Sequence, residues 1–180
     1  MLEVSDDSGF LAVVVPATYE GFVEPDWQLQ QLFRHFAAQM GKRSLLMWGA
    51  GLEGVWRVEV RQRWSRASGF REVSGPIRVV GGAVLVTNYE SLTMAAQFAD
   101  VRLPERHQRD SLVELPDGEY ACRVVQMFDP SEAKSAEEGR PDFVLEFTRA
   151  TGVLEPWPVV PWFEAEQLSW PTDLTENENL

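Results

Sequence analysis

The sequence is poor in cysteine, histidine and lysine, and it has no long apolar run. One residue of 180 is cysteine and two are histidine. A single cysteine excludes an internal disulfide and is typical of a reducing compartment. No apolar run approaches the ~20 residues of a membrane-spanning helix, and Glu3, Asp6 and Asp7 stand where a signal peptide would be positive. We therefore expect a soluble cytoplasmic protein with one domain over 1–168 and an acidic tail over 169–180.

Few residues are candidates for catalysis or metal binding. Cys122 lies on the apolar face of a predicted strand, so a buried thiol is expected rather than a nucleophile served by His107. His35 and His107 are far apart and lack metal-site spacing. The run R-H-Q-R-D-S joins His107, Asp110 and Ser111 in sequence, but catalytic triads are assembled in space. The sequence thus predicts no catalytic residue, metal or cofactor, and we do not expect an enzyme.

Basic residues are missing from both terminal segments. Residues 1–33 hold six acids and residues 150–180 hold six, with no lysine or arginine in either, whereas 34–149 hold all 16 bases and 16 acids. The net charge of −12 therefore comes from the termini. Acidic flanks repel nucleic acid and membrane phosphates, and they favour either solubility alone or a basic protein partner. The arginine-rich stretch 57–71 with Trp64 is more typical of a solvated or internally paired face than of a nucleic-acid track.

Residues 49–54, G-A-G-L-E-G, match the G-x-G-x-x-G spelling of a dinucleotide-binding turn. That turn works only between a strand and a helix, because the pyrophosphate rests on the helix N-terminus. Residues 55–64, V-W-R-V-E-V-R-Q-R-W, alternate with period two and predict a strand. We interpret the motif as a β-hairpin turn in which the glycines supply positive φ angles.

The periodicities predict one long helix among many short strands. Apolar residues of the segment 26–40 recur at helical spacing, with Asp26 as the expected N-cap and Gly41 just past the end. Residues 90–98 are expected to form a short helical insert. Turn residues at Gly81-Gly82 and Pro116-Asp117-Gly118 predict two further hairpins. This pattern indicates a mainly antiparallel β-sandwich or a jelly-roll-like fold.

Residues 153–168 are extended but interrupted by three prolines, which favours an edge strand or a strap across the surface. Two hypotheses for a site follow. A basic protein partner would contact the acidic end of the chain, with two tryptophans as aromatic anchors; the residues are Glu155, Glu164, Glu166, Asp173, Trp157 and Trp162. The tryptophans have an alternative role in packing the strap onto a sheet. The second hypothesis places a sugar or planar ligand at an open end of the sandwich, lined by Trp48, Trp56 and Trp64. The sequence is also compatible with a homodimer.

The order of features over 9–130 resembles the competence protein J family, small bacterial inhibitors of a DNA-entry nuclease. The resemblance is carried by F-A-A-Q-M-G, L-L-M-W-G-A-G-L-E-G-V-W-R-V-E-V, P-I-R-V-V-G-G-A-V-L-V-T-N and S-L-V-E-L-P-D-G-E-Y-A-C-R-V-V. The insert at 90–109 and everything after 130 depart from that order. Immunity proteins, which cap toxins, are a related possibility. The resemblance implies a non-enzymatic inhibitor that neutralises a nuclease or toxin by binding it, and it gives no catalytic residue.

Overall fold

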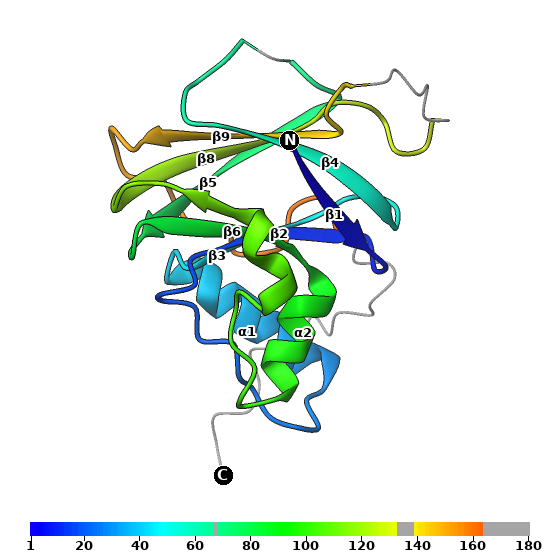
Figure 1. Cartoon of the computed structure of the whole chain (residues 1–180), viewed down its shortest axis with the longest axis vertical. Helices are drawn as coiled ribbons and strands as arrows, with labels where there is room; N and C mark the ends of the chain where they lie inside the picture. Colours follow the sequence, from blue (N-terminus) through cyan, green and yellow to red (C-terminus); the bar gives the residue numbers. More distant parts are fainter. Residues whose placement is uncertain (67, 133–138, 164–180) are drawn as a thin grey trace, which may run out of the picture.

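The computed structural model describes residues 1–66, 68–132 and 139–163. Two β-sheets lie face to face, and two helices cover the outer face of one sheet, so that the molecule has three layers (Figure 1). The prediction of a mainly β, sandwich-like fold with one long helix is confirmed. In the described part of the chain, no helix is long and apolar enough to cross a membrane.

Within the residues that the structure describes, nine strands form the two sheets. The five-stranded sheet has the order β1 (Leu2–Asp6), β4 (Gly54–Arg61), β9 (Phe143–Arg149), β8 (Gly118–Gln126) and β5 (Arg71–Val79). The four-stranded sheet has the order β3 (Leu45–Gly49), β2 (Phe10–Val14), β6 (Ala83–Asn88) and β7 (Leu112–Glu114). Neighbouring strands are antiparallel except β4 and β9, which are parallel. The helices are α1 (Leu29–Gly41), α2 (Tyr89–Gln97) and the short 3₁₀ helix η1 (Arg106–Ser111).

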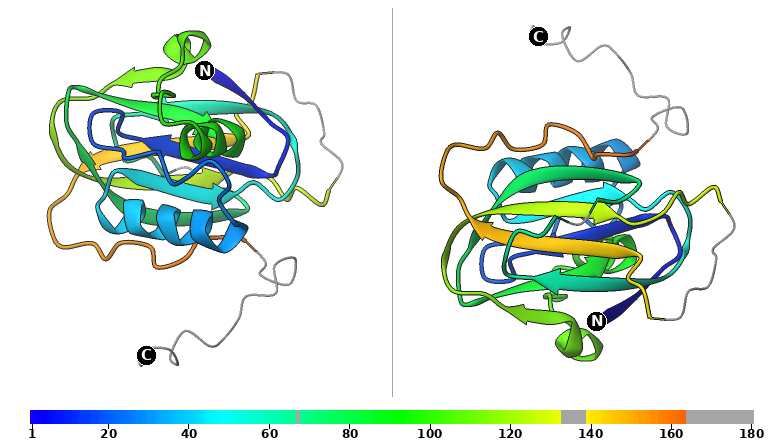
Figure 2. Two further views of the ribbon diagram at one scale, coloured as in Figure 1. Left: turned by 90° about the horizontal axis from the view of Figure 1, so that it is seen from below. Right: turned by 90° about the horizontal axis from the view of Figure 1, so that it is seen from above.

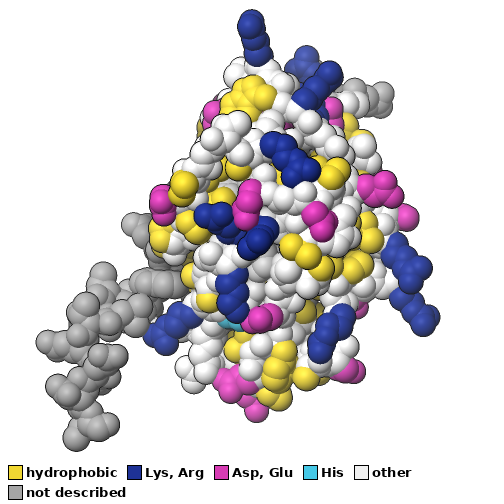
Figure 3. All heavy atoms as spheres, turned by 90° about the vertical axis from the view of Figure 1, so that its left-hand side faces the viewer, with side chains coloured by type: hydrophobic (Ala, Val, Ile, Leu, Met, Phe, Trp, Pro, Cys, Tyr) yellow, Lys and Arg dark blue, Asp and Glu magenta, His cyan; other side chains and the backbone are white. Residues whose placement is uncertain are grey.

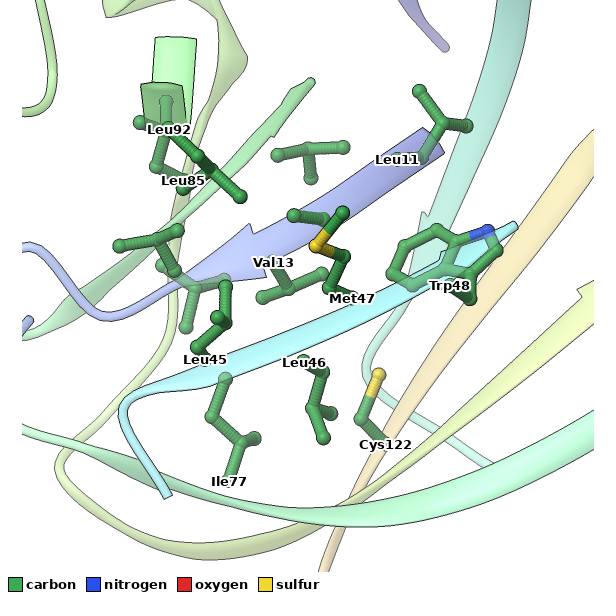
Figure 4. Close-up of a cluster of buried hydrophobic side chains, with 14 of the residues drawn as sticks. Leu11, Val13, Leu45, Leu46, Met47, Trp48, Ile77, Leu85, Leu92 and Cys122 are labelled. Carbon is green, nitrogen blue, oxygen red and sulfur yellow. The ribbon is translucent and has the colours of Figure 1, made fainter. Parts of the chain in front are cut away.

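The four-stranded sheet is the middle layer and is buried on both faces. Every residue of β3 is buried, and so are the last four residues of β2. Figure 4 shows Leu46 on the side of β3 that faces Ile77 and Cys122, and Leu85 beside Leu92 of α2. Burial on both faces explains why these strands are continuous apolar runs. The inner face of the five-stranded sheet is apolar, and its outer face carries charged side chains, which gives its strands their alternation.

The helix α1 begins and ends differently from the prediction. Its N-cap is Gln28, not Asp26, because the backbone N–H of Gln28 donates to Oε1 of Gln31 at 2.6 Å in a capping box. Its last residue is Gly41, and the left-handed backbone conformation expected there is taken by Arg43, with φ of 61°. The predicted apolar stripe is buried against the middle sheet and its surroundings, at Leu32, Phe33, Phe36 and Met40. The short helical insert is confirmed as α2.

The three predicted hairpins are wrong in their pairing, although their turns are right. Tight connections lead from β3 to β4, from β5 to β6 and from β7 to β8, and each one crosses from one sheet to the other. Gly81 and Gly82 have the positive φ expected of a tight turn, 81° and 77°. A glycine turn reverses the chain equally well when the next strand pairs alongside or packs in the facing sheet. The segment after Gly54 is a strand, so the helix that a dinucleotide fingerprint requires is absent there.

Residues 150–163 form a strap that runs from β9 along one side of the sandwich (orange in Figure 2). Trp157 is 7% exposed, and its Nε1 donates to the carbonyl oxygen of Ser74 at 2.8 Å. A Cβ at Gly75 would lie 2.6 Å from the Trp157 ring, so this glycine lets the indole lie against β5. Farther on, the carbonyl of Pro161 accepts the N–H of Gly49 at 2.9 Å. The predicted strap therefore covers the side where the edge strands β3 and β5 lie.

Candidate functional site at one end of the sandwich

The strands run between two ends that differ in charge. We define the pocket end as residues 6–9, 50–54, 70–71, 127–132 and 161–163, and the turn end as residues 41–44, 78–82, 115–119 and 149–152. The pocket end holds five carboxylates and one arginine: Asp6, Asp7, Glu53, Asp129, Glu132 and Arg71. The turn end holds four basic and two acidic residues: Lys42, Arg43, Arg78, Arg149, Asp117 and Glu119. A cavity lies at the acidic end.

A pocket of about 430 Å³ opens at the pocket end. Loops from both sheets and the end of the strap meet around it. Its lining combines aromatic rings, glycines and two opposite charges, from Phe10, Phe70, Trp162, Phe163, Gly9, Gly49, Gly51, Arg71 and Asp129, together with Ser8, Leu52, Pro130 and Ser131. This combination of apolar walls with a few polar groups is typical of binding sites.

Arg71 joins three of the segments that surround the pocket. Its Nε donates to Oε1 of Gln126 at 2.6 Å, and its Nη2 donates to the carbonyl of Gly49 at 3.3 Å. Gln126 is fully buried and donates in turn to the carbonyl of Ala50 at 2.9 Å. The Cζ of Arg71 lies 4.5 Å from the centroid of the Trp162 ring, a cation–π contact. The guanidinium is therefore held in one orientation by its neighbours.

Asp129 supplies the opposite charge. Hydrogen bonds from the side chain and backbone of Ser131 hold the pKa of Asp129 below its usual range, and the nearby charge of Arg71 contributes in the same direction. The carboxylate therefore stays ionised well into the acidic range. Arg71 and Asp129 thus offset one another at the pocket. The excess negative charge comes from the exposed acids around its opening, Asp7, Glu53 and Glu132, which we call the rim carboxylates.

The glycines of the G-x-G-x-x-G stretch allow the loops to approach one another closely. A Cβ at Gly49 would lie 2.5 Å from the carbonyl oxygen of Trp162. A Cβ at Gly51 would lie 2.5 Å from Cγ of Pro130, and the φ of this glycine is 90°. The sequence identifies these residues as a turn, but their packing partners lie about 80 and 110 residues away.

The wall formed by the end of the strap continues into an aromatic cluster over α1. The ring of Phe163 lies 5.1 Å from that of Phe10 and 5.4 Å from that of Phe33, between centroids. The preceding residue, Trp162, has a φ of 59°, which is rare for a bulky side chain. Such a conformation costs about 1–3 kcal/mol and persists where the surroundings impose it. Here the contacts of Trp162 with Arg71 and Gly49 do so.

A second part of the pocket lining, Ser8, Gly9 and Phe10, rests on two carboxyl groups. Oδ1 of the buried Asp6 accepts the N–H of Ser8 at 3.2 Å, and Oγ of Ser8 donates to Oε1 of Glu90 at 2.5 Å. Burial raises the pKa of Asp6, and the negative charge of Glu90 adds to this, against the opposing hydrogen bonds from Phe10 and Ser8. The turn that carries Ser8, Gly9 and Phe10 into the pocket lining is therefore anchored to the start of α2.

The residues proposed from the sequence as partner contacts are divided by the structure. Trp162 is half-buried and lines the pocket. Glu155 is exposed on the strap. Trp157 lies in the contact between strap and sheet and not at the surface, because its indole fills the space above Gly75. The other three, Glu164, Glu166 and Asp173, lie outside the described residues.

The structure does not bring the three tryptophans of the ligand hypothesis together. Trp48 and Trp56 are core residues, 0% and 3% exposed, and both rings contact Phe143. Trp64 is 58% exposed and lies over Arg123 on the outer face of the five-stranded sheet, with 4.9 Å from Cζ to its ring centroid. None of the three belongs to the pocket lining.

Part of the arginine-rich stretch is paired internally on that outer face. Glu146, which is fully buried, accepts from Nη1 of Arg123 at 2.9 Å and from the backbone N–H of Ser65 at 3.1 Å. Arg61 binds Glu59 through two hydrogen bonds of 2.8 and 2.9 Å.

Cys122 is fully buried, and burial raises the pKa of its thiol. Within the described ranges, no three His, Cys, Asp or Glu side chains are grouped to hold a metal.

Comparison with known proteins gives a fold class. No family model matches the chain, and no curated protein matches it. Among solved structures it is similar to the crocagin biosynthetic gene J product, with 14% identity over 82% of this chain and 93% of that chain and a TM-score of 0.51. It also resembles ComJ, the inhibitor of the DNA degrading activity of NucA from Bacillus subtilis, with 13% identity over 83% and 94% and a TM-score of 0.47. These values establish a loose resemblance of fold alone.

Proposed function

We propose that this is a non-enzymatic binding protein that inhibits a nuclease or toxin, and that the pocket end contacts a basic surface of that target. The observation that carries the proposal is the chemistry of this end. Leu52 and Phe70, which line the pocket, are 53% and 49% exposed, and the surrounding loops carry three exposed carboxylates, those of Asp7, Glu53 and Glu132. Aromatic residues and arginine at the centre with a polar rim are typical of protein interfaces.

Electrostatics supports a basic target. The rim carboxylates attract a positive surface during diffusion and orient it, which raises the association rate at low salt. The turn end has more basic than acidic residues. Figure 3 shows the side of the molecule that lies on the left in Figure 1, where lysine and arginine side chains are interspersed with acids. The two ends thus favour an approach of a basic target from the pocket side. Glu155 on the strap adds to the negative charge of the chain, as do Glu164, Glu166 and Asp173, which follow Phe163 in the sequence.

The class of target, a nuclease or toxin, comes from the resemblance of the sequence to the competence protein J family. A cytoplasmic site of action is part of the same proposal. The mode of action is obstruction: an inhibitor that covers the basic surface with which a nuclease holds phosphate needs carboxylates and apolar anchors. It needs no reactive group of its own.

The test combines capture with an activity assay. The immobilised full chain captures proteins from cells that produce it, and each captured protein is then assayed for nuclease or toxic activity with increasing amounts of the free chain. We expect stoichiometric inhibition of one target. The variant Glu53→Gln/Glu132→Gln should require at least about tenfold more protein, because each lost charge weakens attraction. Captured proteins that keep full activity in the presence of excess chain would contradict the proposal.

A matched control comes from the turn end. The variant Asp117→Asn/Glu119→Gln removes the same number of charges at the opposite end of the sandwich. The side-chain Oδ1 of Asp117 accepts the N–H of Gly82 at 2.7 Å, and the amide oxygen introduced by Asp117→Asn can accept the same hydrogen bond, so the turn is kept. Inhibition by this variant should equal that of the wild type. Equal loss in both variants would indicate an effect of net charge and not of the pocket end.

A small ligand is the second candidate. The pocket volume falls within the range of about 300–1,000 Å³ that is usual for ligand sites, and its rings suit a sugar or planar molecule. A thermal-shift screen with sugars and nucleotides tests this role. A stabilising compound whose effect disappears in Phe70→Ala would favour it, and no shift with any compound would count against it.

A further inference from the structure

The pocket and its rim have different chemistries, and together they describe the kind of segment they bind. We propose that the pocket end recognises a short stretch of the target in which one aromatic or large aliphatic side chain is flanked by lysine or arginine. The apolar side chain enters the pocket and the cations meet the rim carboxylates. This inference rests on the proposed function and specifies the partner chemistry of the same site.

The aromatic side chains inside the pocket are held in place, so that an aromatic ring of the target can pack against them. Phe163 is fixed by its contacts with Phe10 and Phe33, and Trp162 is fixed by the cation–π contact with Arg71. These side chains are already ordered, so a guest loses less conformational entropy on binding than it would against mobile rings. Phe70 leaves about half of its surface exposed beside them. An aromatic guest gains burial and favourable ring contacts with this wall.

The rim selects for positive charge. Asp7, Glu53 and Glu132 are exposed on three different loops, and Asp129 is ionised beside Arg71. The single arginine does not reverse this preference, because Gln126, Gly49 and Trp162 occupy its guanidinium and Asp129 lies near it. A segment with flanking acids would face repulsion from all three rim loops. Phosphate-bearing partners meet the same repulsion, which separates this site from a nucleic-acid site.

The experiment uses three acetylated and amidated peptides with the full chain: Lys-Lys-Trp-Lys-Lys, Lys-Lys-Ala-Lys-Lys and Glu-Glu-Trp-Glu-Glu. Titration followed by backbone amide chemical shifts measures dissociation constants into the millimolar range. We expect the first peptide to bind at least about tenfold more tightly than either of the others, with shifts at residues 7–10, 50–53 and 129–132. Equal affinity of the two lysine peptides, preference for the acidic peptide, or shifts confined to the turn end would overturn the inference.

Variants separate the two chemistries. Phe70→Ala should bring the affinity for the Trp peptide close to that for the Ala peptide, because the apolar wall is reduced. Glu53→Gln/Glu132→Gln should weaken binding of both lysine peptides and leave their ratio unchanged. Asp117→Asn/Glu119→Gln should leave all three affinities unchanged, and a melting temperature equal to that of the wild type verifies folding of each variant. Loss of the Trp preference in the rim variant, or its retention in Phe70→Ala, would contradict the assignment of roles.

The outcome is distinguishable from that of the proposed function. If a target is inhibited in a rim-dependent manner but the peptide ranking fails, the inhibitor proposal stands and the segment chemistry is wrong. If the peptide ranking holds but no captured protein is inhibited, the segment chemistry stands and the inhibitor proposal is wrong.

Discussion

At the turn end of the sandwich the strands are joined by short connections that are tied together by charge. Nη1 of Arg43 and Nε of Arg78 lie 3.0 and 3.3 Å from carboxylate oxygens of Glu119. The guanidinium of Arg149 stacks on the ring of Tyr120, with 4.6 Å from Cζ to the centroid. At the pocket end the same strands open into loops from both sheets, which surround a cavity that is lined by Arg71 and the end of the strap, among others.

The difference between the ends separates scaffold from recognition. Loops positioned by a rigid scaffold are where binding residues are concentrated. Here side chains of the turn end bind one another, whereas the pocket end has exposed apolar side chains among mostly acidic residues. The strap takes part in both roles. Its middle, at Trp157, closes the side of the sandwich, whereas its last residues, Trp162 and Phe163, form a wall of the pocket.

The largest effect on stability should come from the middle of the strap. Replacing Trp157 with alanine removes a buried ring from β5 and should lower the free energy of unfolding by about 3–5 kcal/mol. Urea denaturation measures this. Val159→Ala is the control, since Val159 is 63% exposed and should change stability by less than about 0.5 kcal/mol. A loss below about 1 kcal/mol for Trp157→Ala would mean that the strap does not close the fold.

The next effect distinguishes the ends through two glycines. Gly49→Ala forces a Cβ to within 2.5 Å of the Trp162 carbonyl, so the wall must shift and target binding should fall at least about tenfold. Gly82→Ala meets nothing within 4 Å at the turn end, but its φ of 77° makes alanine unfavourable by about 1 kcal/mol. Binding should be unchanged in the second variant. Titration of both variants with the captured target or the Trp peptide measures these affinities. Equal binding by the two variants would show that the end of the strap is not part of the binding site.

The pH dependence of stability tests the part of the pocket lining that rests on Asp6. The pKa of Asp6 is raised in the folded state, so the folded protein binds its proton more tightly than the unfolded chain does. The contribution of Asp6 to stability is therefore fully present below the unfolded-state pKa and declines as pH rises through the folded-state pKa. Asp6→Asn should remove this decline and make the protein more stable than the wild type at neutral pH. Parallel pH profiles of urea midpoints for the two proteins would contradict the assignment.

The smallest effect is expected at the turn end. The side chains of Arg43 and Glu119 are 33% and 39% exposed, and ion pairs of this kind contribute less than about 1 kcal/mol. Arg43→Ala should therefore lower stability only slightly, as measured by melting temperature, and should leave peptide binding unchanged. A tenfold change in binding from this variant would show that the ends are coupled.

The sequence alone predicts where helices and strands lie, but it does not predict which strands pair with one another. Local periodicity identifies α1, the strand after Gly54 and the strap, because side-chain spacing reports which face is buried. It does not determine whether β4 pairs with β3 or lies in the facing sheet, since both arrangements bury the same residues. The sequence does not predict the pocket either, because Gly49, Arg71 and Trp162 come from three distant segments and meet only when both sheets and the strap are assembled.

The tryptophans illustrate the same point. Their number suggests an aromatic site, but Trp48 and Trp56 fill the core and Trp157 seals the strap, and only Trp162 of the four lines the pocket. Phe70 and Arg71, which end the arginine-rich stretch of the sequence, line the pocket.

Photo-crosslinking from the two ends tests the central claim most directly. A photoreactive phenylalanine analogue is placed at Phe70 in one protein and at Arg78 in another, and each is irradiated in cells that produce the chain. Both positions are exposed, and they lie at opposite ends of β5. We predict one protein crosslinked through position 70, basic in composition and inhibited by the free chain, and no specific product through position 78. The same target crosslinked equally from both positions, or from position 78 alone, would contradict the account.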